Sequence, residues 1–198
     1  MRRFATETDR VEAFSDGVFA VIITIMVLEL RPPNGTSFGA LSQSLPALGT
    51  YALSFAFIGI YWNNHHHLLR ASRGVDGRAM WANLNLLFWL SLIPFSTAWL
   101  GANLRASGPT TLYAIVFLLN AVAYTVLQRA LLRVNGPETP FAKAVAVDVK
   151  GQISLLLYAI AIVVSFFYPF ATDALLVTVA VIWFVPDRRF EPLIGIKQ

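Results

Sequence analysis

The first residues that could do chemistry are a hydroxyl and a carboxylate at the start of a long apolar stretch. Ser15 and Asp16 precede a run that stays almost wholly apolar as far as Leu28. An ionised Asp at the centre of a membrane span costs at least about 2.5–3.5 kcal/mol, so such a group usually has a partner. Three roles are open to Asp16: reaching the membrane surface, joining a polar network with a basic residue or histidine of another helix, or serving an ion or proton path.

The same segment carries a stripe that could line a pore. The stripe follows the spacing of one helix face, with one further residue at its border: Gly17, Val21, Thr24 and Leu28, bordered by Ile25. Ala13 and Gly17 form a small-xxx-small pair, which permits close approach of another helix. Such a stripe is more often buried core or lipid-facing surface than pore lining, so the pattern alone leaves all three readings open.

A second polar cluster closes the next apolar stretch with three adjacent histidines, His65, His66 and His67. Consecutive residues point about 100° apart on a helix, so these three cannot face one metal ion. The chain also lacks cysteine and an HExxH motif. The favoured interpretation is hydrogen bonding to neighbouring helices, with Asp16 as one candidate partner. Sensing of pH by a histidine is the alternative, and no metal site is predicted.

Catalytic constellations are absent from the sequence. It contains no GxSxG, no paired aspartates in adjacent apolar stretches and no phosphate-cradling glycine loop. The TVGYG motif of a carbonyl ion filter is absent too. We therefore predict that the chain is not an enzyme and needs no cofactor.

The elements that must position these residues are membrane helices. Of the 198 residues, 57% are hydrophobic and 13% are charged, against about 25% charged in a soluble domain. The net charge of +4 is better explained by membrane orientation than by nucleic-acid binding, because the basic residues lie at the ends of apolar stretches. Apolar runs of this length indicate helices rather than a barrel. We predict an all-α, polytopic membrane protein.

Six spans are expected, in one domain covering residues 1–198. Their ranges are about 11–30, 45–68, 80–103, 110–132, 152–170 and 171–186. The sixth is short, because Pro186 ends it and Asp173 lies near its start. Pro94 removes a backbone donor inside the third span and frees the carbonyl of Leu90, so a kink is expected there.

The distribution of Lys and Arg predicts the orientation of these spans. Thirteen basic residues lie before the first span and after the second, fourth and sixth, whereas the opposite side holds only Arg31 and Arg105. The positive-inside rule then places both termini in the cytoplasm. We expect a multi-pass protein of the plasma membrane.

The first three spans contain five short motifs. They are, in chain order, Arg10-xxx-Phe14-Ser15-Asp16, Leu28-Glu29-Leu30, Trp62-xx-His65-His66, Trp81-x-Asn83-Leu84 and Pro94-Phe95-Ser96-Thr97. Together these motifs resemble the transmembrane protein 175 family of potassium channels. Eukaryotic members resemble two fused six-helix repeats, so the single set of spans looks like a prokaryotic member.

The resemblance implies a homotetramer whose central pore is lined by the first helix of each subunit. In that family, bulky apolar side chains form the constriction. Carried onto this sequence, the ring positions are Val21, Ile25 and Leu28, with Thr24 as a polar ring beside them. Val21 is smaller than the Ile or Leu usual there, which makes Leu28 a candidate for the narrowest point. The remaining motif residues would pack the helix against its neighbours: Arg10, Phe14, Ser15, Asp16, His66 and Asn83.

The function expected from this resemblance is a potassium-selective cation channel. An apolar ring can gate by dewetting, and potassium, which is less strongly hydrated than sodium, would be modestly favoured. Glu29 near the outer mouth would enrich cations, or it would pair with Arg31. The alternatives are a proton-coupled cation transporter or proton leak pathway, in which Asp16 and a histidine exchange protons, and a scaffold without transport.

Overall fold

The computed structural model describes residues 2–104, 106–146 and 148–184, with side chains from residue 7 onward. Every regular element in this part of the chain is an α-helix, so the predicted all-α class is confirmed. In chain order the helices are α1 (Arg2–Leu28), α2 (Phe38–Ser42), α3 (Leu45–Ala71), α4 (Gly77–Leu90), α5 (Ile93–Ala102), α6 (Ser107–Asn135), α7 (Pro140–Ala146), α8 (Val149–Ser165) and α9 (Pro169–Phe184).

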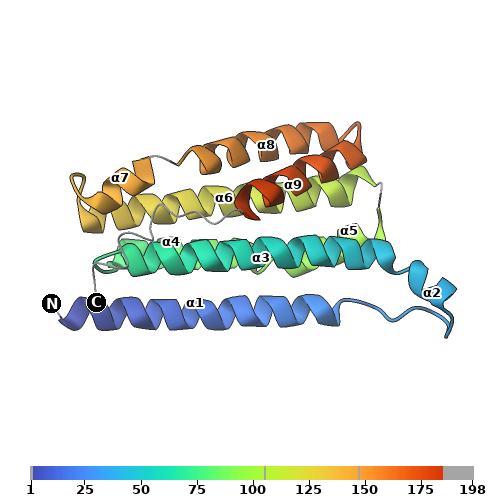
Figure 1. The fold of residues 1–198 in the computed structure, drawn as a ribbon, viewed down its shortest axis with the longest axis horizontal. Helices are drawn as coiled ribbons and strands as arrows, with labels where there is room; N and C mark the ends of the chain where they lie inside the picture. The colour runs from blue at the N-terminus through green and yellow to red at the C-terminus, as the bar shows by residue number, and fades with distance from the viewer. Residues whose placement is uncertain (1, 105, 147, 185–198) are drawn as a thin grey trace.

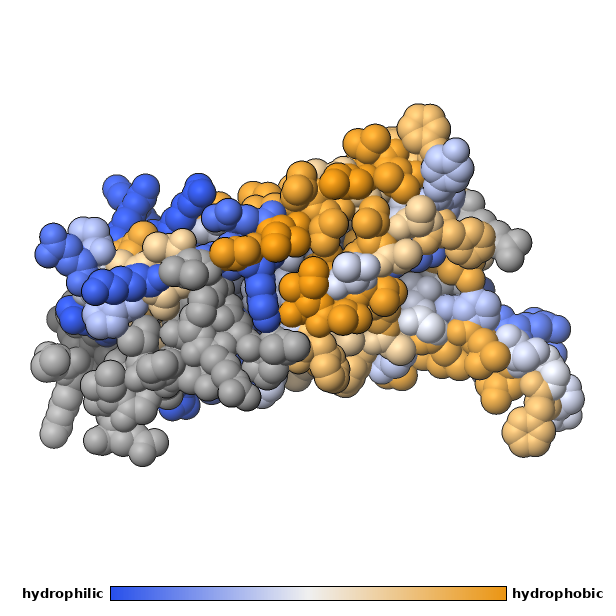
Figure 2. Space-filling model, turned by 45° about the horizontal axis from the view of Figure 1, so that its top comes forward, coloured by the Kyte–Doolittle hydropathy of each residue, from blue (hydrophilic) through white to orange (hydrophobic). Residues whose placement is uncertain are grey.

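The described helices include five that are long and apolar enough to cross a membrane. These segments are Glu7–Leu28, Leu45–Ala71, Gly77–Ala102, Ser107–Asn135 and Pro140–Ser165. A sixth apolar helix, Pro169–Phe184, is shorter. Figure 2 shows hydrophobic residues gathered over the middle of the molecule and many hydrophilic residues towards one end. This distribution is typical of a protein whose middle faces lipid.

The helices form layers, with α1 on one side of the molecule and α8 and α9 on the other (Figure 1). Between them, α3, α5 and α6 share a core in which the rings of Phe57 and Phe117 lie 4.3 Å apart between centroids. In the same core the Ser54 hydroxyl lies 2.7 Å from both the Thr97 and Tyr113 hydroxyls. Every member of this polar group has a partner, as burial requires. The result is a cross-linked platform on which α1 rests.

Near the kink expected at Pro94, the helix is interrupted for two residues, Ser91 and Leu92, between α4 and α5. Asn120 of α6 supports the open end of α4, because its side-chain amide donates to the Trp89 carbonyl at 3.3 Å and to the Val116 carbonyl at 2.8 Å. The Ser91 hydroxyl donates to the Phe88 carbonyl at 2.7 Å. Backbone carbonyls at a helix end need donors in lipid, and these two side chains supply donors to the carbonyls of Phe88 and Trp89.

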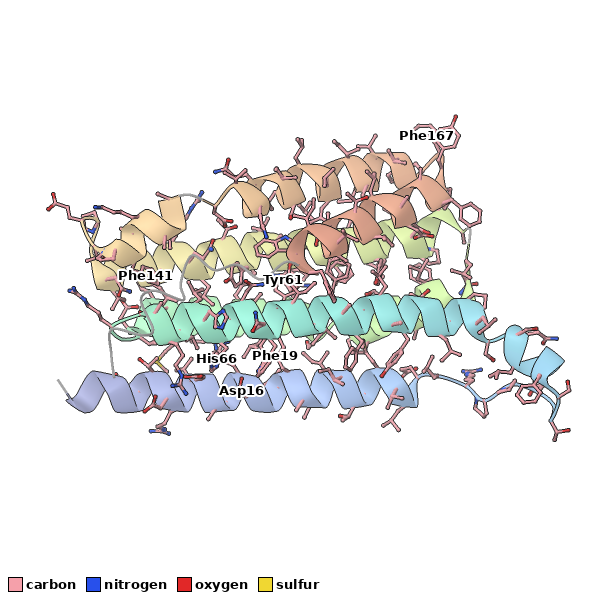
Figure 3. All side chains as sticks on the ribbon, viewed as in Figure 1. Asp16, Phe19, Tyr61, His66, Phe141 and Phe167 are labelled. Atoms are coloured by element: carbon pink, nitrogen blue, oxygen red, sulfur yellow. The ribbon has the colours of Figure 1, made fainter. Side chains whose placement is uncertain are left out.

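The boundary between the last two spans differs from the predicted one at residues 170 and 171. Helix α8 ends at Ser165 and α9 begins at Pro169, so the turn lies about four residues earlier. Proline disfavours helical geometry in the residue before it and is well suited to start a helix. Figure 3 shows Phe167 at this turn. The stop predicted at Pro186 lies outside the described residues.

Replacing Asn120 by Ala should lower the free energy of unfolding by about 1 kcal/mol, because it removes the interhelical bond to Trp89. Unfolding in a detergent–denaturant titration would measure the change. Thr125→Ala is the matched control, since the Thr125 hydroxyl donates only to the Ala121 carbonyl of its own helix, at 2.9 Å. Equal stability of the two variants would show that Asn120 does not support the break.

Candidate pore-lining helix and its polar anchor

One face of α1 is buried against the platform. Phe19, Ile22 and Met26 are each almost fully buried and belong to the same apolar core as residues of α3 and α5. The spacing of three and four residues places their side chains along one side of the helix. The Phe19 ring also meets the His65 ring edge-on, at 5.6 Å between centroids. This face fixes α1 to the rest of the subunit.

The opposite face of α1 carries the predicted ring residues and is uncovered within this chain. Val21, Ile25 and Leu28 are 54%, 43% and 80% exposed. Thr24 is exposed as well, and its hydroxyl donates to the Val21 carbonyl at 2.9 Å. The reading of the stripe as buried core of a single subunit is therefore wrong. The stripe faces lipid, a pore or another copy of the chain.

A buried hydrogen-bond chain joins α1, α4 and α3 near the start of the apolar stretch. The Asn83 amide nitrogen donates to the Ser15 hydroxyl at 3.0 Å, and Ser15 donates to the Val11 carbonyl at 2.8 Å. His65 Nε2 lies 2.6 Å from the Asn83 amide oxygen. That oxygen can only accept, so Nε2 carries the proton. Ser15 and Asn83, which sequence reasoning placed in one network, are thus in direct contact.

Asp16 has a polar partner on α3, although not the type that was expected. The Trp62 indole donates to Asp16 Oδ1 at 2.9 Å, whereas a basic residue or a histidine was predicted. The carboxylate is half-buried and lies between α1 and α3, close to His66 in the view of Figure 3. The Trp62 and His66 rings lie 6.0 Å apart, so the two residues extend one polar strip along α3.

His66 binds a carboxylate that the sequence analysis missed. His66 Nδ1 lies 2.7 Å from Glu12 Oε1, and Arg70 Nε lies 3.2 Å from the same oxygen. Glu12 is only 6% exposed, and a buried carboxylate needs such partners. Spacing could have revealed it: Glu12 and Asp16 are four residues apart on α1, facing Trp62, His66 and Arg70 at intervals of four on α3. We call these five residues, with Ser15, His65 and Asn83, the polar anchor.

Arg10 and Phe14 belong to the same motif but lie outside the polar anchor. Both are exposed, and they line an open cavity of about 430 Å³ between α1 and α4, which Met80 and Leu84 also line. Phe14 is 56% exposed, so it does not pack α1 against the helices of this chain. Its packing role therefore stays a prediction that only another copy or lipid could fulfil.

Glu29 lies just beyond the end of α1 at the opposite end of the subunit. It lines an open cavity of about 660 Å³ between the end of α1, α3 and α5, to which Arg31 also contributes. In the described part of the chain no ion pair joins Glu29 to Arg31. Glu29 is exposed, so its side chain is accessible from this cavity.

Comparison with known proteins connects this arrangement with one family. The family model described as endosomal/lysosomal potassium channel TMEM175 matches residues 10–94, which hold the ring residues and the polar anchor. A potassium channel of Chryseobacterium sp. (strain P1-3) is 46% identical over 182 residues, covering 92% of this chain and 95% of that protein. The human endosomal/lysosomal proton channel TMEM175 is 35% identical over 83 residues, covering 34% of this chain and 16% of that protein.

A solved structure has a similar arrangement of helices over most of this chain. It is the crystal structure of a lysosomal potassium-selective channel TMEM175 homolog from Chamaesiphon minutus, similar at a TM-score of 0.82 and 27% sequence identity. The likeness covers 92% of this chain and 98% of that one. The Chryseobacterium relative is likewise matched over nearly its full length, so the similarity extends well beyond the signature motifs. The resemblance seen in the sequence is confirmed, and the chain belongs to the TMEM175 family of membrane channels.

Proposed function

We propose that this chain forms a potassium-selective cation channel, with the exposed face of α1 from several copies lining a shared pore. The observation that carries the proposal is the apolar stripe of Val21, Ile25 and Leu28, left uncovered on a helix whose other face is fixed by apolar packing and by the polar anchor. A rigidly held helix with an unpartnered stripe can present the same side chains in every copy. The names of the bacterial relatives as potassium channels add support.

Side chains rather than backbone carbonyls would form the constriction. A ring of Val21, Ile25 and Leu28 excludes water when narrow, and an unhydrated cation then pays a large desolvation cost. Thr24 gives its hydroxyl proton to the Val21 carbonyl, so the oxygen lone pairs stay free to meet a cation. A partly hydrated potassium ion could pass such a collar at a lower cost than sodium, because potassium holds its water less tightly.

The proposal also includes an assembly and an orientation in the membrane. We propose a homotetramer in the plasma membrane with both termini in the cytoplasm, as the count of basic residues predicts. Glu29, exposed and without an Arg31 partner, would then ring the outer mouth and raise the local cation concentration. The polar anchor would sit at the cytoplasmic end, away from the ions.

Leu28→Asn should raise the current and lower the preference for potassium over sodium, because a polar ring no longer dewets. The measurement is the bi-ionic reversal potential of purified protein in planar bilayers. Val27→Asn is the control, since Val27 is 47% exposed on the same helix but points about 100° away from Leu28. No potassium current from the unmodified protein, or the same change in both variants, would refute the proposal.

A proton pathway is the second candidate, supported by the ionisable polar anchor on α1 and by the naming of vertebrate relatives as proton channels. Liposomes with opposed potassium and pH gradients separate the two functions. Under our proposal the reversal potential follows the potassium gradient, and the reversal potential of the Asp16→Asn variant is unchanged. A reversal potential that follows the pH gradient, and shifts in Asp16→Asn, would favour the proton pathway instead.

Glu12→Gln should destabilise the subunit by about 1–3 kcal/mol, because His66 and Arg70 lose their shared carboxylate. Chemical unfolding in detergent would measure the loss. Asp9→Asn removes an exposed carboxylate from the same helix and should change stability by less than about 0.5 kcal/mol. If the two variants are equally stable, the ion pair does not hold α1 in place.

A further inference from the structure

A basic cavity lies outside the proposed pore, between the beginning of α4 and the end of α6. Its volume is about 490 Å³ and it opens to the surface. Each of the two helices contributes three of the larger side chains that line it: Arg78, Trp81 and Asn85 from α4, and Val126, Arg129 and Arg133 from α6. Neither the conduction path nor the polar anchor uses any of these residues.

Helix periodicity explains why the residues converge. Arg78, Trp81 and Asn85 stand at i, i+3 and i+7, and the three residues of α6 repeat the same spacing, so each set lies on one face. Small residues at the joint let the helices approach closely: Ala82 and Ala130 are 7% and 9% exposed and form part of the cavity wall. The cavity is therefore a feature of helix packing and not of a loop.

The cavity concentrates positive charge that the described chain leaves unbalanced. Arg78, Arg129 and Arg133 are exposed, and no salt bridge between described residues involves any of the three. No acidic side chain lines the cavity. Three like charges around one space repel each other, and a guanidinium presents paired donors that match the oxygens of a phosphate. The chemistry that would relieve this repulsion is an anion with several oxygens.

Apolar surface beside the cavity distinguishes a lipid headgroup from a free anion. Trp81 is 75% exposed beside Arg78, which suits the interface between headgroups and acyl chains. One turn deeper along each helix, Phe88 and Val122 are 56% and 43% exposed. Polar donors in the cavity and exposed apolar side chains next to it match the headgroup and the acyl chains of a phospholipid.

We propose that this cavity binds the phosphate headgroup of an anionic phospholipid. Arg129 and Arg133 hold the phosphate from α6, and Arg78 completes the site from α4. Trp81 flanks the glycerol region, and the acyl chains run past Val126 and Phe88. Basic pockets between membrane helices are established sites for anionic headgroups in general. This inference concerns a surface away from α1 and stands independently of the ion that the protein conducts.

The test is native mass spectrometry of the purified full chain in neutral detergent, titrated with dioctanoyl phosphatidylglycerol. Dioctanoyl phosphatidylcholine and inorganic phosphate are titrated in parallel. Arg129→Gln with Arg133→Gln should weaken phosphatidylglycerol binding at least about tenfold. The control is Arg73→Gln with Lys143→Gln, which removes the same charge from exposed positions outside the cavity. Arg78→Gln, on the other helix, provides a second variant if the first does not fold.

Selective loss of phosphatidylglycerol binding in the cavity variants, with the control unchanged, supports the proposal. Equal weakening in the control would show only general charge attraction, and equal binding of phosphatidylcholine would show a site indifferent to headgroup charge. Inorganic phosphate that displaces the lipid at similar concentration would identify a free-anion site. A change of oligomeric mass in the cavity variants would make this face a contact between copies. Each of these last four results overturns the proposal.

Discussion

The rest of this structure depends on how α1 is fixed along one side only. Apolar packing of Phe19, Ile22 and Met26 supplies area, but such contacts tolerate rotation of a helix about its axis. The polar anchor does not, because hydrogen bonds and ion pairs lose strength when distance or direction changes. A shift of the register by one residue would turn α1 by about 100°. Such a turn would break the contact between Glu12 and His66, whose atoms Oε1 and Nδ1 now lie 2.7 Å apart. The anchor thus determines which side chains stay uncovered.

The neighbouring platform explains why the anchor can be so specific. Three side-chain hydroxyls join α3, α5 and α6, because that of Ser54 lies 2.7 Å from those of Thr97 and Tyr113. Asn120 joins α6 to the end of α4. These cross-links hold α3 and α4 in a fixed relation. His65 and Asn83, which come from those two helices, bind each other at 2.6 Å and together present the polar surface that Ser15 of α1 contacts.

The sequence predicted the helical class because an apolar run in a membrane must satisfy its own backbone. Family motifs also placed Ser15 and Asn83 in one structural network, without predicting which of its members are in contact. The pairing of Asp16 with Trp62 could not be predicted: several donors lie along one side of α3, and helix register decides among them. Glu12 could have been found from its four-residue spacing to Asp16, which matches the spacing of Trp62, His66 and Arg70 on α3. The turn before Pro169 was misplaced because hydropathy is uniform across α8 and α9. Participation of Val21, Thr24, Ile25 and Leu28 in a pore stays a prediction.

The break between α4 and α5 divides the support of α1 into two parts. The first half of α1 is joined to α4 through Ser15 and Asn83, while Met26 lines the same cavity as Thr97 and Ala98 of α5. No continuous backbone hydrogen-bond ladder joins the two supports, since Pro94 has no amide proton to give. Helices α1 and α3 are both continuous across this interruption, so these two helices carry any mechanical coupling between the polar anchor and the opposite end of α1. A tilt of α5 would move that end while the polar anchor kept its register.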